Sequence, residues 1–287
     1  MSVINNLSEK QNELDFLQIQ FCARHLYNVA TILNYIAWLC CILTTIVLPL
    51  LSDLLGSLNY VIAVVVNILV IVIGVLSSRF VKLGAAYKMR FDYKLYQFQD
   101  CEIYQGYTTD RLREIAAKII NRYKKSYIKA ISHNGTDKPN GVKDWYVEIS
   151  KDMSRAEAIK NCQKQNGFFD KEIMKIAWWV FVGLVSALII VFVILNLTNT
   201  VAEAVIYVLS GFALIKMIVT EIYYYVMVYA MYYFEDKVKD EPEVSPLTRQ
   251  KIIDERRKLN LITPNIIYKI KSFKLHSLVK AEEHIQI

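Results

Sequence analysis

Four long apolar runs constrain the possible folds of this chain more than any other feature of its sequence. Two are Leu33–Ser52 and Leu58–Ser78, and two more extend from about Ile176 to Leu197 and from near Val201 through Phe234. About 20 apolar residues are enough for a helix to cross the hydrocarbon core of a membrane. We predict four transmembrane helices, because a chain of 287 residues has too little polar mass to shield four such runs from water.

The distribution of Lys and Arg predicts the orientation of these helices in the membrane. The connections Asp53–Ser57 and Thr198–Thr200 contain neither residue, whereas 20 of them lie between Arg79 and Lys175 and 11 follow Phe234. By the positive-inside rule, both connections face outward, while the N-terminus, the central region and the C-terminus face the cytosol. Residues 1–30 lack the pattern of a signal peptide, so we expect none.

The N-terminal segment and the segment after the second apolar run are predicted to be helical as well. Residues 4–32 are expected to form one amphipathic helix that leads into the first span. Its apolar side consists of Leu7, Leu14, Leu17 and Phe21. The second span is expected to continue as a helical stalk to about Asp100, because no proline and only one glycine, Gly84, interrupt it.

Capping residues predict where two further helices begin. One helix is expected to start at Thr109, with Thr108 or Thr109 as its N-cap, and to end before the turn-rich segment Asn134–Gly141. Ser154 and Glu157 match a capping box. The helix that they open is expected to run into the third span without a break, unless Gly167 kinks it.

The predicted fold class is an all-α membrane protein, since no strand pattern is convincing. Its four transmembrane helices form two hairpins, with a helical cytosolic central region between them. In the tail, Ser245-Pro246 opens one helix, and Thr263-Pro264 separates it from a last basic helix. The predicted segments are 1–32 (cytosolic helix), 33–78 (first transmembrane hairpin), 79–175 (cytosolic region), 176–230 (second transmembrane hairpin) and 231–287 (cytosolic tail).

Motifs for catalysis and for metal binding are absent from the sequence. It contains no G-x-S-x-G, no Walker A run, no H-E-x-x-H and no dinucleotide fingerprint. The five cysteines form no C-x-x-C pair, and none stands near a histidine at metal-ligand spacing. We therefore expect a protein that is not an enzyme, with no catalytic residue, no bound metal and no resident cofactor.

Lys216, Glu221 and Asn67 are the candidate functional polar side chains that fall within the predicted spans or at their edge. Lys216 is expected in the inner third of the bilayer, and a charge at the bilayer centre costs about 2.5 to 3.5 kcal/mol. Either Lys216 and Glu221 contribute to a polar lumen or an interhelical pair, or Lys216 reaches the headgroups and Glu221 lies at the surface. Asn67 either lines a pore or hydrogen-bonds a neighbouring helix.

Two further patterns leave alternatives open. Six tyrosines between Tyr223 and Tyr233 are typical of an interfacial belt, or else they offer stacking faces to a nucleobase. Residues 79–175 contain 20 Lys or Arg and 12 Asp or Glu, which gives a net charge of +8. This charge either sets the topology and attracts anionic lipid, or it forms a site for an anionic ligand such as a nucleotide.

Several short strings of residues stand in a fixed order along nearly the whole chain. They are Ala23-Arg24-x-Leu26-Tyr27, Ala85-Ala86, Phe91-Asp92, Asp144-Trp145-Tyr146, Cys162-Gln163-Lys164-x-Asn166 with Asp170, the set Gln250, Ile253 and Arg256, and Pro264 with Tyr268. In this order and at this spacing, the strings resemble the SMODS-associated four-transmembrane effectors of bacterial antiphage defence. The layout of two plus two spans agrees with that resemblance.

The resemblance implies a pore-forming effector in the bacterial inner membrane. In such systems a nucleotidyltransferase makes a cyclic oligonucleotide on infection, and the effector then permeabilises the membrane, so that the cell dies or stops growing before phage matures. A cyclic di- or trinucleotide is the activating ligand that the resemblance implies. Ligand-contact or coupling residues are expected among Arg24, Asp144, Trp145, Tyr146, Gln163, Asn166 and Arg256.

Partners and alternative functions follow from the same prediction. Two helical hairpins are too few to enclose a wide pore, so we expect a homo-oligomer in the lipid bilayer, and we expect no DNA or RNA partner. The alternative is a non-conducting membrane receptor or scaffold that docks a cytosolic partner. A small transporter is a weaker alternative, since no broken-helix pattern is present.

Overall fold

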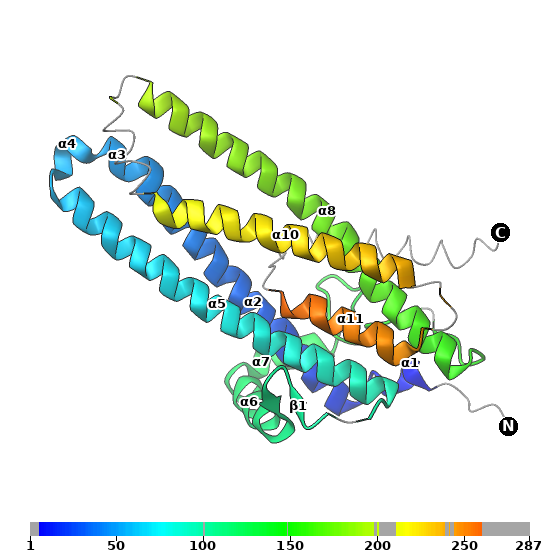
Figure 1. Ribbon diagram of the computed structural model, residues 1–287. Helices are drawn as coiled ribbons and strands as arrows, with labels where there is room; N and C mark the ends of the chain where they lie inside the picture. Colours follow the sequence, from blue (N-terminus) through cyan, green and yellow to red (C-terminus); the bar gives the residue numbers. More distant parts are fainter. Residues whose placement is uncertain are drawn as a thin grey trace.

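The computed structural model of the protein describes residues 6–99, 101–147, 149–197, 200, 211–238, 241 and 244–259. Four helices in these ranges are long and apolar enough to cross a membrane, and they lie along one another as a bundle (Figure 1). They are α2 (Leu14–Ile42), α5 (Leu58–Tyr96), α8 (Arg155–Asn196) and α10 (Phe212–Val238). This arrangement confirms the all-α fold class. The predicted start of the fourth span near Val201 and the last basic helix after Pro264 lie outside the described residues.

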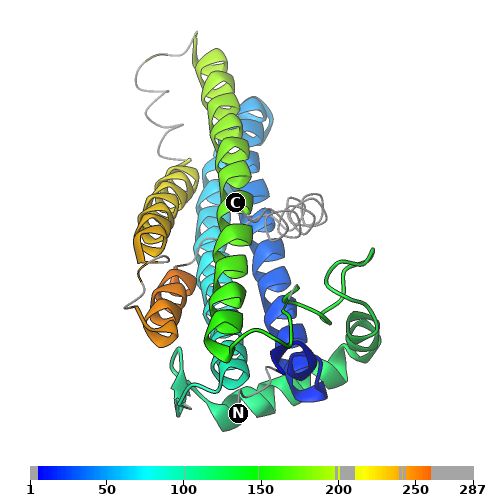
Figure 2. The same ribbon diagram turned by 90° about the vertical axis from the view of Figure 1, so that its right-hand side faces the viewer.

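The two ends of the bundle differ in structure. The turn end holds α3 (Leu48–Leu50) and α4 (Ser52–Leu55), which connect α2 to α5. Figure 2 shows the segment of α6 and α7 lying across the opposite end, which we call the basic end. The short helices of the basic end are α1 (Leu7–Lys10), α6 (Thr109–Arg122), α7 (Lys124–Ile131) and α11 (Pro246–Lys258).

Burial along the first hairpin changes from the basic end to the turn end. At the basic end, α2 and α5 share a core in which the rings of Phe16 and Phe91 meet edge to face at 5.6 Å. Nearer the turn end, apolar side chains of α5 such as Val61, Val64 and Ile68 are exposed. A buried apolar core at the basic end and an exposed apolar surface toward the turn end are what a helix that passes from water into a bilayer requires.

The N-terminal segment forms two helices, so the prediction of a single helix over residues 4–32 was wrong. α1 ends at Lys10, and α2 begins only after Glu13, whose backbone is extended with ψ of 147°. The break positions the buried side chain of Gln11, which forms two hydrogen bonds of 2.9 Å with the backbone of Tyr146. Leu14, expected on the apolar side, is 60% exposed at the first position of α2, whereas Leu17 and Phe21 of the same helix are buried.

A wider helical turn continues α2 toward the turn end. Residues Leu43–Val47 form a π-helical segment, η1, directly before α3 and its Pro49. Proline has no amide hydrogen to donate, and a π-turn is one way in which a helix accommodates such a local change. Gly56 then leads into α5 with φ of +50°, a left-handed conformation that glycine adopts without steric strain.

α5 is one continuous helix of 39 residues that passes from the turn end into the basic end. It ends at Tyr96, short of the predicted limit near Asp100, because Gln97 adopts a left-handed conformation with φ of +52°. The chain then forms a hairpin of two short strands, β1 (Ile103–Tyr104) and β2 (Tyr107–Thr108). The expectation of no strand was wrong here, since two-residue strands are too short to produce an alternating pattern.

Three predicted helix starts are confirmed by their caps. The side chains of Thr108 and Ser245 each accept a backbone amide hydrogen, in the first turns of α6 and α11. Ser154 and Glu157 form the capping box that opens α8. α8 then continues for 42 residues through Gly167, so the third span and the helix before it are one rigid element, as predicted.

Replacing Gly84 with leucine should destabilise the hairpin of α2 and α5. A Cβ atom at Gly84 would lie 3.1 Å from the ring of Tyr27 on α2, and overpacking of this kind costs about 1 to 3 kcal/mol. We expect Gly84→Leu to lower the melting temperature in detergent.

The matched control is Gly74→Leu on the same helix, where a Cβ atom would meet nothing within 4 Å. Both variants gain the same helix propensity, so that contribution cancels. Equal melting temperatures for the two variants would contradict the close approach of Gly84 to Tyr27.

Candidate functional site

A cavity of about 370 Å³ lies between α2, α5 and α10, and we call it the span cavity. On α5 its lining extends from Val70 to Arg79, within the length of the long apolar helices. Apolar side chains alternate with polar ones along its wall. The polar lining residues are Asn34, Ser77, Ser78, Arg79, Lys216, Thr220, Glu221 and Tyr224.

The polar residues of the span cavity connect the three helices that enclose it. The side chain of Asn34 on α2 hydrogen-bonds to Glu221 on α10. Ser77 on α5 donates a hydrogen bond of 3.2 Å to the backbone oxygen of Ala30 on α2. Lys216 borders the cavity from an exposed flank of α10, where it forms no hydrogen bond or ion pair with any described residue.

Asn67, the third polar residue predicted within the spans, is not part of this lining. It lies on α5 nearer the turn end than Val70, and its side chain is half-buried. The structure therefore brings Lys216 and Glu221 to one cavity and leaves Asn67 outside it.

A second polar cluster lies at the basic end and is centred on Asp92 of α5. The carboxylate of Asp92 is fully buried. It accepts hydrogen bonds from the Tyr146 hydroxyl at 2.9 Å, from Gln250 Nε2 at 3.0 Å and from Arg257 Nη1 at 2.6 Å. Donors of this kind, one of them charged, offset the desolvation of a buried carboxylate. We call Asp92 and the residues bonded to it, directly or through one partner, the Asp92 network.

Tyr146 connects the central region to α5 and α8 within this network. Its hydroxyl accepts hydrogen bonds from Asn166 Nδ2 at 2.6 Å and from the Tyr96 hydroxyl at 3.0 Å. Burial raises the pKa of Tyr146 well above its usual range, so the hydroxyl keeps the proton that it donates to Asp92.

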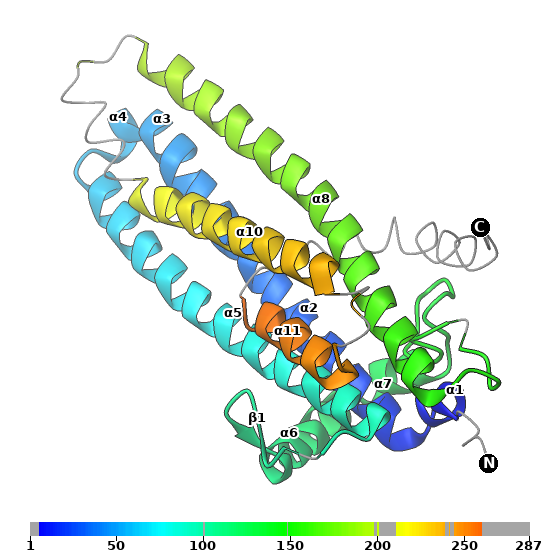
Figure 3. The ribbon, with the colours of Figure 1, turned by 45° about the vertical axis from the view of Figure 1, so that its right-hand side comes forward.

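Gln163 and Arg256 tie α8 and α10 to α11. Gln163 Nε2 donates to Gln250 Oε1 at 3.2 Å. The buried Arg256 donates from Nη1 to Asp170 at 2.6 Å and to the hydroxyl of Tyr232 at 2.7 Å. Figure 3 shows the result, with α11 seated against α5 at the basic end and α8 and α10 on its other side.

Arg24, Asp144 and Trp145 dock the central region onto the N-terminal part of the chain and onto α5. Arg24 donates to two backbone oxygens of the central region, at 2.8 and 3.0 Å. Asp144 accepts a hydrogen bond of 2.6 Å from the Asn12 side chain. The ammonium group of Lys88 lies 3.6 Å from the centre of the Trp145 ring. These contacts place all three residues at the basic end, away from the span cavity.

The structure thus gathers Tyr146, Gln163, Asn166 and Arg256 around or beside one buried carboxylate. Sequence reasoning did not select the centre of that cluster or its partners on α11. Gln250, Asp254 and Arg257 recur at spacings of four and three residues, so they share a face of α11. That polar face is the signal by which they could have been found. Within the described residues, no group of three His, Cys, Asp or Glu side chains could hold a metal ion.

Asp254 is the second buried carboxylate of the Asp92 network. Burial raises its pKa to about 7, although the positive charge of Arg257 opposes this rise. Arg257 Nη1 lies 3.5 Å from Asp254 but only 2.6 Å from Asp92. The carboxamide of Gln250 and the hydroxyl of Tyr93 also face Asp254. One guanidinium therefore lies beside two carboxylates, and it is closer to Asp92 than to Asp254.

The variant Asp254→Asn should gain stability relative to the wild type as the pH rises. The folded protein holds a proton on Asp254 up to about pH 7, whereas the unfolded chain releases it near 3.8. The stabilising contribution of this group is therefore complete below the unfolded pKa and is lost as the pH rises through the folded one. The melting temperatures of both proteins in detergent, measured across this range, give the comparison.

Asp110→Asn is the control, because Asp110 is exposed on α6. We expect its melting temperature to follow that of the wild type at every pH. A difference between Asp254→Asn and the wild type that stays constant with pH would show that Asp254 does not titrate in this range.

Comparisons with known proteins bear on the function of these two polar regions. The sequence matches the family described as "SMODS-associating 4TM effector domain" over residues 5–217. A search of the curated proteins and of the solved structures gave no match. The matched range includes α1 through α8 and the start of α10, whereas α11 follows it.

Proposed function

This chain belongs to the SMODS-associating 4TM effector family and is a multi-pass membrane effector of antiphage systems, and we propose that it permeabilises the membrane when a cyclic oligonucleotide binds. The family assignment gives the membrane location and the effector role. The pore and the nucleotide signal are the proposal, and the span cavity is the observation that carries it.

The span cavity supports a permeation role because of where its polar groups lie. Lys216, Glu221 and Asn34 line it on helices that are long and apolar enough to cross a membrane, so these polar groups lie within the depth of the bilayer in this proposal. Ionisable groups at such depth are expensive in hydrocarbon, so they usually face a bundle interior or a water-filled cavity. A hydrated cavity between α2, α5 and α10 is the simplest starting point for a path through the bilayer.

The orientation that we propose places the basic end in the cytosol. The positive-inside rule favours it, since the Lys- and Arg-rich segments gather at that end. Both termini then face the cytosol of a bacterial cell, and the protein lies in its inner membrane. A soluble nucleotide made in the cytosol would meet the central region and α11 directly.

A homo-oligomer is part of the proposal, because the described residues of one chain leave α8 largely uncovered. Only 6% of the most apolar 18-residue stretch of α8 is buried, against 22 to 28% for the three other long helices. Gly183, Ser186 and Ala187 lie exposed on this helix. Small residues let two membrane helices approach closely, so this side of α8 fits a second copy of the chain.

Coupling between a ligand and the spans would pass through the Asp92 network. The network joins the central region, α5, α8 and α11, and Arg256, the neighbour of Arg257 on α11, separately ties α11 to α10. Because α5 and α8 run unbroken from the basic end into the spans, a displacement at one end of either helix moves the other. Tyr146, Gln163, Asn166 and Arg256 act as coupling residues in this proposal, not as ligand contacts.

Liposomes that contain the purified protein and a trapped dye provide the direct test. We expect release when one member of a panel of cyclic di- and trinucleotides is added, and none with the others. No release with any of them, from folded and inserted protein, would contradict the proposal. That result would favour the non-conducting receptor or scaffold.

Filling the span cavity should block permeation without unfolding the protein. Gly74 lines the cavity, and a Cβ atom there would meet nothing within 4 Å. We expect Gly74→Leu to reduce dye release several-fold without lowering the melting temperature. The control is Val72→Leu, because Val72 is exposed on α5 outside the lining. Equal release from both variants would show that the cavity is not on the path.

Oxidative cross-linking tests the proposed contact between copies through α8. We expect Ala187→Cys to give covalent dimers in membranes, because Ala187 is exposed beside Gly183 on the uncovered side of α8. The wild type, with its five free cysteines, reports any background. Val64→Cys on the exposed side of α5 is the matched control. Dimers from Val64→Cys and none from Ala187→Cys would place the interface elsewhere.

A further inference from the structure

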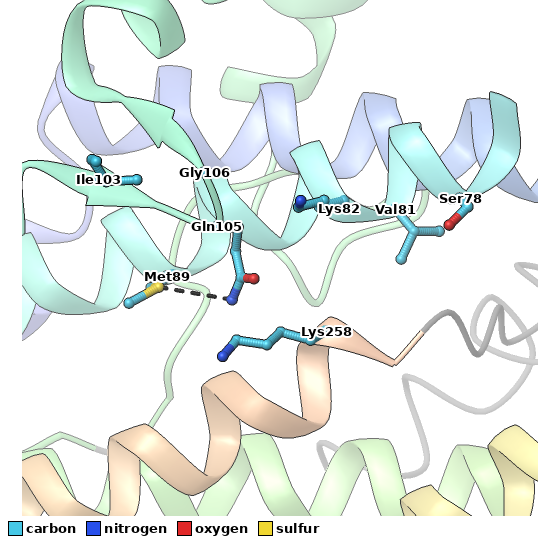
Figure 4. Close-up of a pocket in the computed structure, with 8 residues that line it drawn as sticks. All are labelled: Ser78, Val81, Lys82, Met89, Ile103, Gln105, Gly106 and Lys258. Carbon is cyan, nitrogen blue, oxygen red and sulfur yellow. Dashed lines mark hydrogen bonds between the residues drawn. The ribbon is translucent and has the colours of Figure 1, made fainter. Parts of the chain in front are cut away.

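A second hollow, of about 500 Å³, lies at the basic end between α5, the turn of the β-hairpin and α11. Figure 4 shows the side chains of Lys82, Gln105 and Lys258 arranged around it. They come from α5, from the β1–β2 turn and from the last residue of α11. The remaining lining residues are Ser78, Val81, Met89, Ile103 and Gly106.

The charge of this hollow is uniformly positive. No Asp or Glu stands among its lining residues, whereas two lysines do. Lys82 forms no ion pair with any described residue, and Lys258 pairs only with the exposed Glu255. Ammonium groups that lack buried carboxylate partners are available to an anion, and lysine is a common ligand of phosphate oxygens.

The turn of the β-hairpin holds a polar side chain in an unfavourable backbone conformation. Gln105 and Gly106 form the two-residue connection, and both have positive φ, +52° and +86°. Glycine and asparagine are the usual residues at such positions, so glutamine at Gln105 is held there at some cost. Its Nε2 points to Met89 Sδ at 3.9 Å, which is a weak acceptor. The carboxamide can therefore turn to a better acceptor in the hollow.

Position and size indicate what kind of anion fits. Ser78, the last residue of the predicted second span, lines both this hollow and the span cavity. Lys82 lies one helical turn beyond it, at the depth of phosphate headgroups if α5 crosses the bilayer as proposed. The volume is within the range of ordinary small-molecule sites, about 300 to 1,000 Å³. Both a lipid headgroup and a cyclic nucleotide offer a phosphate diester to such a site.

We propose that this hollow is a binding site for a phosphate diester, held by the ammonium groups of Lys82 and Lys258 and by the carboxamide of Gln105. The inference deepens the proposed function and rests on it for its consequence. A diester bound there bridges α5 and α11, next to Arg257, which anchors α11 to Asp92. Binding would thus favour the docked position of α11 on α5, beside Ser78, which lines both this hollow and the span cavity.

Direct binding to the full-length protein tests the site without any measurement of permeation. One arm measures binding of individual cyclic di- and trinucleotides to the protein in detergent by calorimetry. The other arm measures, by native mass spectrometry, whether phosphatidylglycerol is retained over phosphatidylcholine from mixed nanodiscs. The wild type should bind in one arm, which identifies the source of the diester.

The double variant Lys82→Gln/Lys258→Gln should weaken that binding at least about tenfold, or about 1.4 kcal/mol. The control is Lys118→Gln/Lys125→Gln, which removes the same charge from exposed positions of α6 and α7 and should bind as the wild type does. Gln105→Gly keeps a turn that tolerates positive φ and removes only the carboxamide. It should also bind more weakly, with a melting temperature no lower than that of the wild type.

Binding that is equal in the wild type, both double variants and Gln105→Gly would overturn the proposed site, as would a wild type that binds in neither arm. Dye release that persists alongside such a result would leave the proposed function standing. Conversely, binding that depends on Lys82 and Lys258, with no release by any nucleotide, would support the site and contradict the pore.

Discussion

The buried carboxylate of Asp92 is the constraint on which the basic end of the molecule depends. A carboxylate without solvent needs hydrogen-bond donors, and these come from two separate parts of the chain: Tyr146 of the central region, and Gln250 and Arg257 of α11. Removal of Arg257 would leave the charge of Asp92 buried without its ionic partner, which typically costs about 3 to 5 kcal/mol. The central region and α11 are therefore held in place by the need to satisfy one side chain of α5.

The same helix connects this constraint to the proposed path through the membrane. α5 carries Asp92, then Lys82 of the proposed diester site, then Ser78 and Gly74 of the span cavity, all on 39 residues without a break. A continuous helix transmits a displacement along its axis, whereas a hinge would absorb it. The spacing of the sites along one rigid element is thus a physical reason for them to respond together.

Local signals in the sequence were enough to predict the elements, but not their contacts. The spans and the caps at Thr108, Ser154 and Ser245 follow from hydropathy and from neighbouring residues. The break after α1 does not, because it depends on a bond between Gln11 and a residue 135 positions away. The same holds for the candidate site. Sequence strings pointed to Tyr146 and Arg256, yet nothing local indicates that Asp92 pairs with a residue 165 positions later.

The bonding of α11 also determines how a ligand can act on it. Small displacements of α11 would separate Arg257 from Asp92 while both remain buried, so intermediate positions are unfavourable. Two arrangements avoid this penalty: α11 docked with its charges paired, or α11 withdrawn with its charges in water. A ligand shifts such an equilibrium only by its difference in affinity for the two states. A diester held between Lys82 and Lys258 has that difference, because the two ammonium groups face one hollow only while α11 is docked.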